Sequence, residues 1–125
     1  MLEVEVIGDA LAAEDVRRAA VLAASSGGVD DGHVAIEFVA PGRITELNAA
    51  HRGKDGPTDV LSFPVDEDER AVGPRELGDV LICPEHTEDL LEAVVHGVLH
   101  LTGMDHETDD GEMLALQAEL LGWVR

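Results

Sequence analysis

The segment from His96 to His106, HGVLHLTGMDH, limits the possible fold of this chain more than any other part of the sequence. His96 and His100 are four residues apart, so on a helix their side chains lie on one face about one turn from each other. Gly103 comes just after the last helical turn, where a glycine can take the left-handed conformation that ends a helix and turns the chain back. That turn would bring His106 toward the same point. The segment therefore predicts a helix and a following turn that hold three histidines around one metal ion.

Three neutral imidazoles leave one coordination position of a zinc-like ion open for water, which is typical of catalytic zinc sites and not of closed structural ones. The spacing matches the ligand frame of the metzincin peptidases, H-E-x-x-H-x-x-G-x-x-H. In those peptidases the glutamate after the first histidine deprotonates the bound water, and here that position is Gly97. The segment therefore predicts the metal frame of a peptidase without the general base of one.

Other polar residues near this frame have more than one interpretation. Asp105 could orient an imidazole, act on the bound water, or be a solvated aspartate in a turn. His86 is expected to be exposed and not to coordinate, and His33, at the start of a strand, has no functional signal.

Hydrophobic periodicity predicts alternating strands and helices. Strands are expected at residues 2–6, 33–40, 59–63 and 78–83, and helices at about 12–25, 41–52, 88–102 and 110–122, with Thr87 as N-cap of the third helix. The acidic stretch at residues 66–76, DEDERAVGPRE, is expected to be a solvated loop. The side chains expected to pack are Ala13, Val16, Ala20, Leu22 and Ala23 of the first helix and Leu114, Leu116, Leu120 and Leu121 of the last. The prediction is a single α+β domain over residues 1–125, with a four-stranded mixed sheet packed with helices.

Composition excludes several classes of function. The 125 residues contain 8 Lys and Arg against 27 Asp and Glu, a formal charge of −19, which argues against loose adhesion to nucleic acid or to anionic lipid. Cys83 is the only cysteine, so no intrachain disulfide can form. The acidic N-terminus does not match a signal peptide, and no apolar run approaches the roughly 18 residues of a membrane span. A cytoplasmic protein without membrane association is expected.

Three blocks of the sequence resemble the YbeY-type endoribonucleases, also called rRNA maturation factors. The metal segment HGVLHLTGMDH is similar to the family pattern H-G-x-L-H-L-x-G-Y-D-H. Residues 47–64, LNAAHRGKDGPTDVLSFP, resemble the family block L-N-x-x-Y-R-x-K-D-x-P-T-D-V-L-S-F-P, and residues 78–83, GDVLIC, resemble a third block. Together the blocks cover most of residues 38–115 in the family order.

The resemblance implies a zinc-dependent endoribonuclease specific for single strands, which acts in maturation of the 3′ end of 16S rRNA and in ribosome quality control. His96, His100 and His106 would bind one zinc ion per chain, and Arg52 would be the catalytic arginine. Cleavage of a phosphodiester places negative charge on the non-bridging oxygens, which a metal and a guanidinium can stabilise together. The implied partners are single-stranded rRNA precursor, the small ribosomal subunit with its proteins, and an Era-type GTPase. Either water or the ribose 2′-hydroxyl could be the nucleophile.

The sequence also departs from the family pattern. His51 and Met104 stand where the family has tyrosines, and the segment between residues 83 and 96 is about one helix shorter than the family pattern. Two other functions stay open. One is a non-catalytic ribosome-assembly factor with a structural metal, and the other is a metallopeptidase, which Gly97 disfavours.

The charges are unevenly distributed along the chain. Residues 76–124 contain twelve Asp and Glu and no Lys or Arg, whereas five of the eight basic residues lie between Arg43 and Arg75. We therefore expect the metal ion to supply positive charge on one side of a cleft, with Arg43, Arg52 and Lys54 facing it. Arg43 and Lys54 are the weaker candidates for contacts to the RNA backbone. Weak RNA affinity with a small salt dependence would follow.

Overall fold

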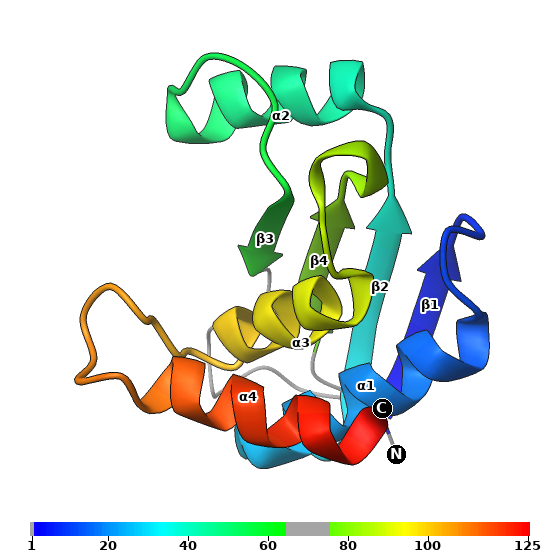
Figure 1. Cartoon of the computed structure of the whole chain (residues 1–125), viewed down its shortest axis with the longest axis vertical. Coiled ribbons are helices and arrows are strands. Elements are labelled where there is room, and N and C mark those ends of the chain that lie inside the picture. The colour runs from blue at the N-terminus through cyan, green and yellow to red at the C-terminus, as the bar shows by residue number, and fades with distance from the viewer. Residues whose placement is uncertain (1, 65–75) are drawn as a thin grey trace.

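The structure, a computed structural model, describes residues 2–64 and 76–125. The strands are β1 (Leu2–Ile7), β2 (Gly32–Phe38), β3 (Val60–Pro64) and β4 (Glu76–Ile82). The helices are α1 (Ala13–Ser26), α2 (Pro41–Arg52), α3 (Leu90–Leu101) and α4 (Glu112–Val124), with a short 3-10 helix η1 (Pro84–His86) (Figure 1). Each predicted strand and helix is confirmed within two residues of its expected bounds. The predicted acidic loop lies outside the described residues, apart from Glu76.

The four strands form one sheet in the order β1-β2-β4-β3. β2 runs parallel to both β1 and β4, and β3 is antiparallel to β4, so the predicted mixed sheet and α+β class are confirmed. α1 connects the two parallel strands β1 and β2, as parallel pairing requires a crossover. β1 and β3 are therefore the two edges of the sheet.

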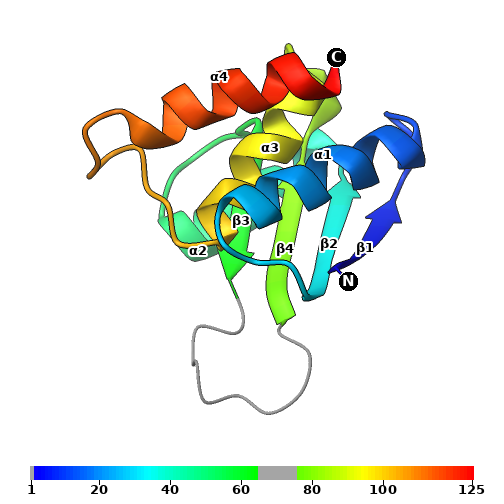
Figure 2. The same ribbon diagram turned by 90° about the horizontal axis from the view of Figure 1, so that it is seen from below.

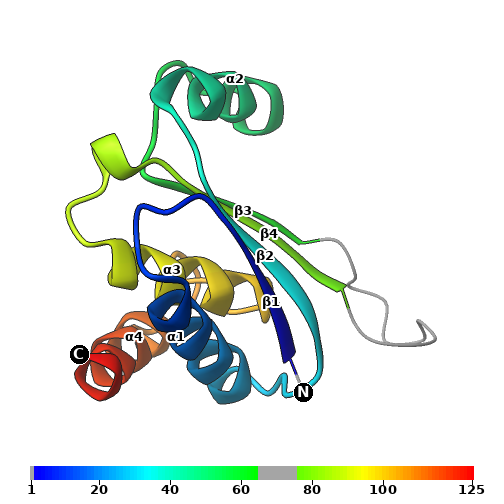
Figure 3. The same ribbon diagram turned by 90° about the vertical axis from the view of Figure 1, so that its right-hand side faces the viewer.

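The helices are not spread evenly about the sheet. α1, α3 and α4 lie together on one face, and α2 lies apart from them at one end of the sheet (Figures 2 and 3). Side chains of β4 alternate accordingly, with Val80 and Ile82 in the large core against α1, α3 and α4 and Leu81 in a smaller cluster with Ile44 of α2. The core thus fixes α3 against β3 and β4. No helix in the described parts of the chain has the length and apolarity that crossing a membrane requires.

One local prediction was wrong. The N-cap of α3 is Asp89 and not Thr87, because the Asp89 carboxylate accepts a hydrogen bond from the Glu92 amide at 3.2 Å. The Thr87 hydroxyl instead donates to the Cys83 carbonyl at 2.6 Å, next to η1.

The helix faces that pack in α1 and α4 differ in part from the predicted ones. Leu114 is 48% exposed, and Leu22 and Leu116 are only partly buried. The buried residues are Val16, Ala19, Ala20, Ala23 and Ala24 in α1 and Met113, Gln117, Leu120, Leu121 and Val124 in α4. The α4 set repeats every three or four residues, and Leu114 is one position off this stripe.

His33, for which the sequence carried no signal, links three strands on the sheet. Its Nδ1 lies 2.7 Å from a Glu76 carboxylate oxygen, and its Nε2 lies 3.5 Å from Glu5. The hydrogen bond to Glu76, and then the negative charges of Glu76, Glu5 and Glu3, raise the pKa of His33 above its usual value, against the opposing effect of burial. A protonated His33 therefore connects edge strand β1 to β4 through β2.

We expect His33→Gln to lower stability at acidic pH more than at alkaline pH. Because the pKa of His33 is raised by folding, its stabilising effect is fully present below the unfolded value of about 6.5 and is lost as pH rises through the folded value. The loss at pH 5.5 should be about 1 kcal/mol or less, since the pair is partly exposed. Urea unfolding of both proteins at pH 5.5 and pH 8.5 measures it. An equal difference at the two pH values would contradict this assignment.

Candidate metal centre

The end of α3 and the turn after it bring the three predicted ligands together. His96 and His100 come from α3, and His106 comes from the turn. One ligand nitrogen from each residue lies within 4.8 Å of the other two, and the ring centroids are 4.7 to 5.2 Å apart. All three side chains are half-buried. We call this set the His cluster, and its geometry could hold a metal ion.

The turn forms because a glycine ends α3. Gly103 has φ +105°, in the region that side chains with a Cβ rarely adopt, and the Met104 amide then donates back to the Leu99 carbonyl at 3.3 Å. The Asp105 side chain accepts from the Glu107 amide at 2.9 Å, and the Asp105 carbonyl accepts from the Asp109 amide at 3.1 Å. Asp105 is exposed and part of this turn, as one of its three interpretations expects.

The environment of His100 favours the neutral form that binds metals. Burial, and then repulsion by His96 and His106, hold the pKa of His100 below its usual value. A neutral imidazole has one nitrogen lone pair free for a cation. His100 is therefore suited to coordinate a metal ion near neutral pH.

Gln117 of α4 is a polar contact of the cluster that sequence reasoning missed. Its side chain is 9% exposed, and its Oε1 lies 2.8 Å from His96 Nδ1. The only signal in the sequence was a polar residue within the apolar stripe of α4. This contact joins α4 to the His cluster.

Gly97 allows α3 to approach the sheet closely. A Cβ at this position would lie 2.4 Å from Val80 Cγ1, and the Ser62 hydroxyl donates to the Gly97 carbonyl at 3.1 Å. No side chain fits there without movement of buried Val80. The general base of a metzincin peptidase therefore cannot come from residue 97, which weakens the metallopeptidase alternative further.

The predicted basic residues all lie on or just after α2. Arg52 is exposed at the end of α2 and makes no ion pair with any other described residue, and Lys54 is exposed in the following loop. Arg43, near the start of α2, lies 4.0 Å from the carboxylate of Glu37. Two expectations about these residues remain predictions. One is that their side chains face the His cluster across a cleft, and the other is that RNA binding depends only weakly on salt.

Two further residues shape the end of α2. Asn48 is 3% exposed and its Nδ2 donates to the Gly56 carbonyl at 2.9 Å, which fixes the loop that carries Lys54. His51, at the family's tyrosine position, packs edge-on against Phe63 with ring centroids 4.8 Å apart. An aromatic contact is thus present at this position. Met104, at the other tyrosine position, is partly buried against the large core.

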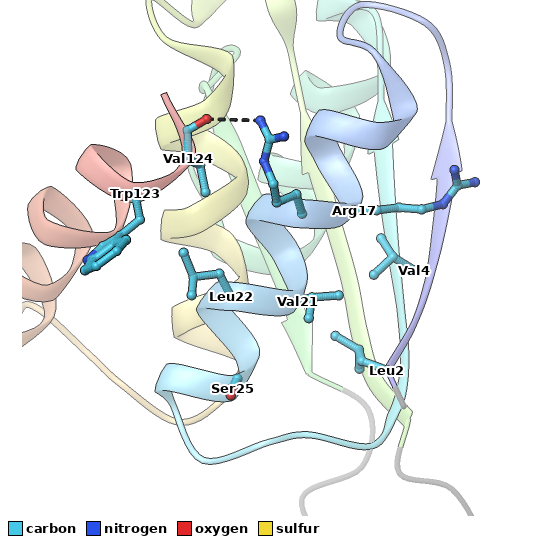
Figure 4. A pocket seen from close by; sticks show the side chains of 9 residues that line it. Leu2, Val4, Arg17, Val21, Leu22, Ser25, Trp123 and Val124 are labelled. Atoms are coloured by element: carbon cyan, nitrogen blue, oxygen red, sulfur yellow. Dashed lines mark hydrogen bonds between the residues drawn. The ribbon is translucent and has the colours of Figure 1, made fainter.

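An open groove of about 680 Å³ lies away from this centre, between β1, α1 and the end of α4 (Figure 4). Its walls are mostly apolar and include Trp123, which is 74% exposed, and the Arg18 guanidinium donates to the Val124 carbonyl there at 3.1 Å. No residue of the His cluster lines this groove. The candidate site is therefore defined by the His cluster and not by this groove.

Comparisons with known proteins give matches over most of this chain. A family model described as Endoribonuclease YbeY matches residues 5–124. The chain is 44% identical over 99 residues to Endoribonuclease YbeY of Rubrobacter xylanophilus, an alignment that covers 75% of this chain and 69% of that protein. It is 35% identical to Endoribonuclease YbeY of Macrococcus caseolyticus over 132 aligned positions, covering 90% of this chain and 86% of the relative.

A solved structure is similar over almost the whole chain. The solution structure of TM1509 from Thermotoga maritima aligns with a TM-score of 0.60 and 32% identity, covering 99% of this chain and 89% of that one. The residues that the family model matches include the whole of α3 and the turn that carries His106. This chain therefore belongs to the YbeY endoribonuclease family.

Proposed function

We propose that this chain is a zinc-dependent endoribonuclease that cleaves single-stranded RNA in the maturation of the 3′ end of 16S rRNA and in ribosome quality control. One observation carries the proposal, namely that three imidazole nitrogens from α3 and the turn after it lie within 4.8 Å of one another in a chain of the YbeY family. Residues 1–125 would form one such domain. Its substrate would be rRNA precursor in the cytoplasm, and the small ribosomal subunit and an Era-type GTPase would be its partners.

The donor set fits one zinc ion. His96, His100 and His106 would hold it, because neutral imidazoles suit zinc and three of them leave a position for a further ligand. The lowered pKa of His100 supports a neutral donor at that position, and the contact of His96 with Gln117 would orient a second imidazole. When bound, zinc supplies Lewis-acid chemistry, either polarising a phosphate oxygen or lowering the pKa of a water molecule.

Arg52 would stabilise the charge that develops on phosphate. Its planar guanidinium can donate two parallel hydrogen bonds to non-bridging oxygens, which strengthen as negative charge builds up. The guanidinium is exposed, and among the described residues it has no ion-pair partner to compete with the substrate. Lys54, in the next loop, and Arg43, paired with Glu37, would make weaker backbone contacts.

Asp105 is proposed as the proton acceptor because it precedes His106 directly and its negative charge acts on His100. Its carboxylate already accepts one backbone hydrogen bond, from Glu107, and a carboxylate has further lone pairs to accept another. The nucleophile would be water or the ribose 2′-hydroxyl. A product with a cyclic phosphate would indicate the hydroxyl.

Cleavage assays with Arg52 variants test the proposal. We expect zinc-loaded protein to cleave single-stranded RNA in preference to duplex RNA, and Arg52→Ala to lower kcat/KM about 100-fold or more, as loss of a donor to a developing oxyanion does. Arg52→Lys should recover little, because lysine cannot donate in parallel to two oxygens.

Arg17→Ala is the matched control, since it removes an exposed arginine of α1 that lines the groove distant from the His cluster. Its activity should stay near that of the wild type. Equal losses in Arg17→Ala and Arg52→Ala would point to general charge instead of a specific clamp. Wild-type activity that a chelator leaves unchanged would overturn the zinc-dependent function.

The charge distribution favours a second candidate, a non-catalytic assembly factor that docks on basic ribosomal protein and holds a structural metal. The observation that supports this candidate is the composition of residues 76–124, which contain twelve acidic residues and no Lys or Arg. Complementation of a strain lacking the protein separates the two functions. Rescue by Arg52→Ala, which keeps the three proposed metal ligands, would favour the assembly factor, and failure to rescue would favour the nuclease.

A further inference from the structure

A partly buried contact between two helices places a hydrogen-bond acceptor against one ligand of the His cluster. His96 of α3 and Gln117 of α4 are 21 residues apart in sequence, and His96 Nδ1 lies 2.8 Å from Gln117 Oε1. An amide oxygen can only accept, so Nδ1 must donate and therefore carries the proton. The lone pair of His96 is then on Nε2.

We propose that Gln117 is a positioning residue, which holds His96 in the Nδ1–H tautomer so that Nε2 coordinates the metal ion. The inference rests on the proposed zinc site and deepens it. Metal-binding histidines usually donate their other ring N–H to a carbonyl, carboxylate or water, and this partner sets both the tautomer and the orientation of the ring. Gln117 would supply that partner from a helix outside the motif.

The surroundings of Gln117 make the contact persistent. Gln117 is 9% exposed and lies in the stripe of α4 that packs into the large core, together with Met113 and Leu120. Water therefore has little access to compete for its side-chain oxygen. A polar side chain in such a place loses its hydration on folding, and this costs free energy unless a hydrogen bond compensates. The bond from His96 therefore also compensates the side-chain oxygen of Gln117.

Gln117→Met tests the proposal, because methionine is unbranched and of similar length but has no strong acceptor. We expect the metal-free variant to show a mixture of His96 tautomers where the wild type shows only Nδ1–H. Long-range proton–nitrogen NMR of histidine rings measures this without RNA. Competition with a chromogenic chelator should show Zn²⁺ affinity weaker by about 10- to 100-fold.

Gln117→Glu tests rescue and covers the case in which Gln117→Met does not fold. A carboxylate is a stronger acceptor than an amide, so this variant should keep the Nδ1–H tautomer and bind Zn²⁺ at least as tightly as the wild type. Met113→Leu is the matched control for packing, because it changes a buried α4 side chain of the same core by a volume-conserving swap. It should alter neither tautomer nor affinity.

Three results would overturn the proposal. They are an unchanged tautomer in Gln117→Met, weaker Zn²⁺ binding in Gln117→Glu than in the wild type, and an effect of Met113→Leu as large as that of Gln117→Met. The tautomer readout needs neither metal nor RNA, so it distinguishes failure of this inference from failure of the proposed nuclease. A protein that lacks ribonuclease activity but shows the tautomer shift would still support the role of Gln117.

Discussion

Replacing His100 by alanine is expected to lower ribonuclease activity about a thousandfold or more and to reduce bound zinc from one ion per chain toward none. His100 lies between the other two histidines of the cluster in the chain, and its ring centroid is 4.7 Å from that of His96 and 5.2 Å from that of His106. Two imidazoles alone bind zinc poorly, and loss of the ion removes several kcal/mol of charge stabilisation from the transition state. Elemental analysis and single-turnover cleavage measure the two effects.

The fold should survive this substitution. His100 is half-buried, and alanine is the best helix former, so α3 should keep its structure. His86→Ala is the matched control, because His86 is exposed on η1 and is not part of the His cluster. Circular dichroism should show native structure in both variants. Loss of activity in His100→Ala with full zinc content would show that the histidine acts other than as a ligand.

Much of the candidate site could be predicted because its determinants are local. Gly103 ends α3 with φ +105°, and this single conformational requirement brings His106 back toward His96 and His100. The bounds of α2 were predicted as they are found, since a proline begins the helix and a glycine with φ +65° follows it. Short-range signals of this kind are visible in a single sequence.

The rest depends on contacts between distant segments. Gln117 reaches His96 across 21 residues, and the sequence shows only that α4 contains a glutamine. The predicted N-cap of α3 was wrong because Thr87 and Asp89 both have a side-chain oxygen that can cap a helix. The Thr87 hydroxyl donates to the Cys83 carbonyl instead, and the Asp89 carboxylate caps α3. The exposure of Leu114 follows from how α4 rotates on the core, which periodicity alone does not determine to within one residue.

Gly97→Ala is expected to destabilise the protein by about 1–2 kcal/mol, although alanine is the better helix former by about 1 kcal/mol. The added Cβ would lie 2.4 Å from Cγ1 of Val80, a distance at which something must shift. Val80 is fully buried on β4 and is stiff at χ1, so α3 itself has to move away from the sheet. Because α3 carries His96 and His100, zinc affinity should fall as well. Urea unfolding and chelator competition measure these effects.

Gly122→Ala separates the packing effect from helix propensity. Gly122 is also within a helix, α4, but a Cβ there would meet nothing within 4 Å, so this variant should gain about 0.5–1 kcal/mol. The same substitution, glycine to alanine, then changes the free energy of unfolding in opposite directions at the two sites. In addition, Val80→Ala opens space for the new Cβ, so the double variant should lose less stability than the sum of the two single losses, by about 1 kcal/mol or more. Additive losses would show that the close approach of α3 to β4 does not explain the glycine in the metal motif.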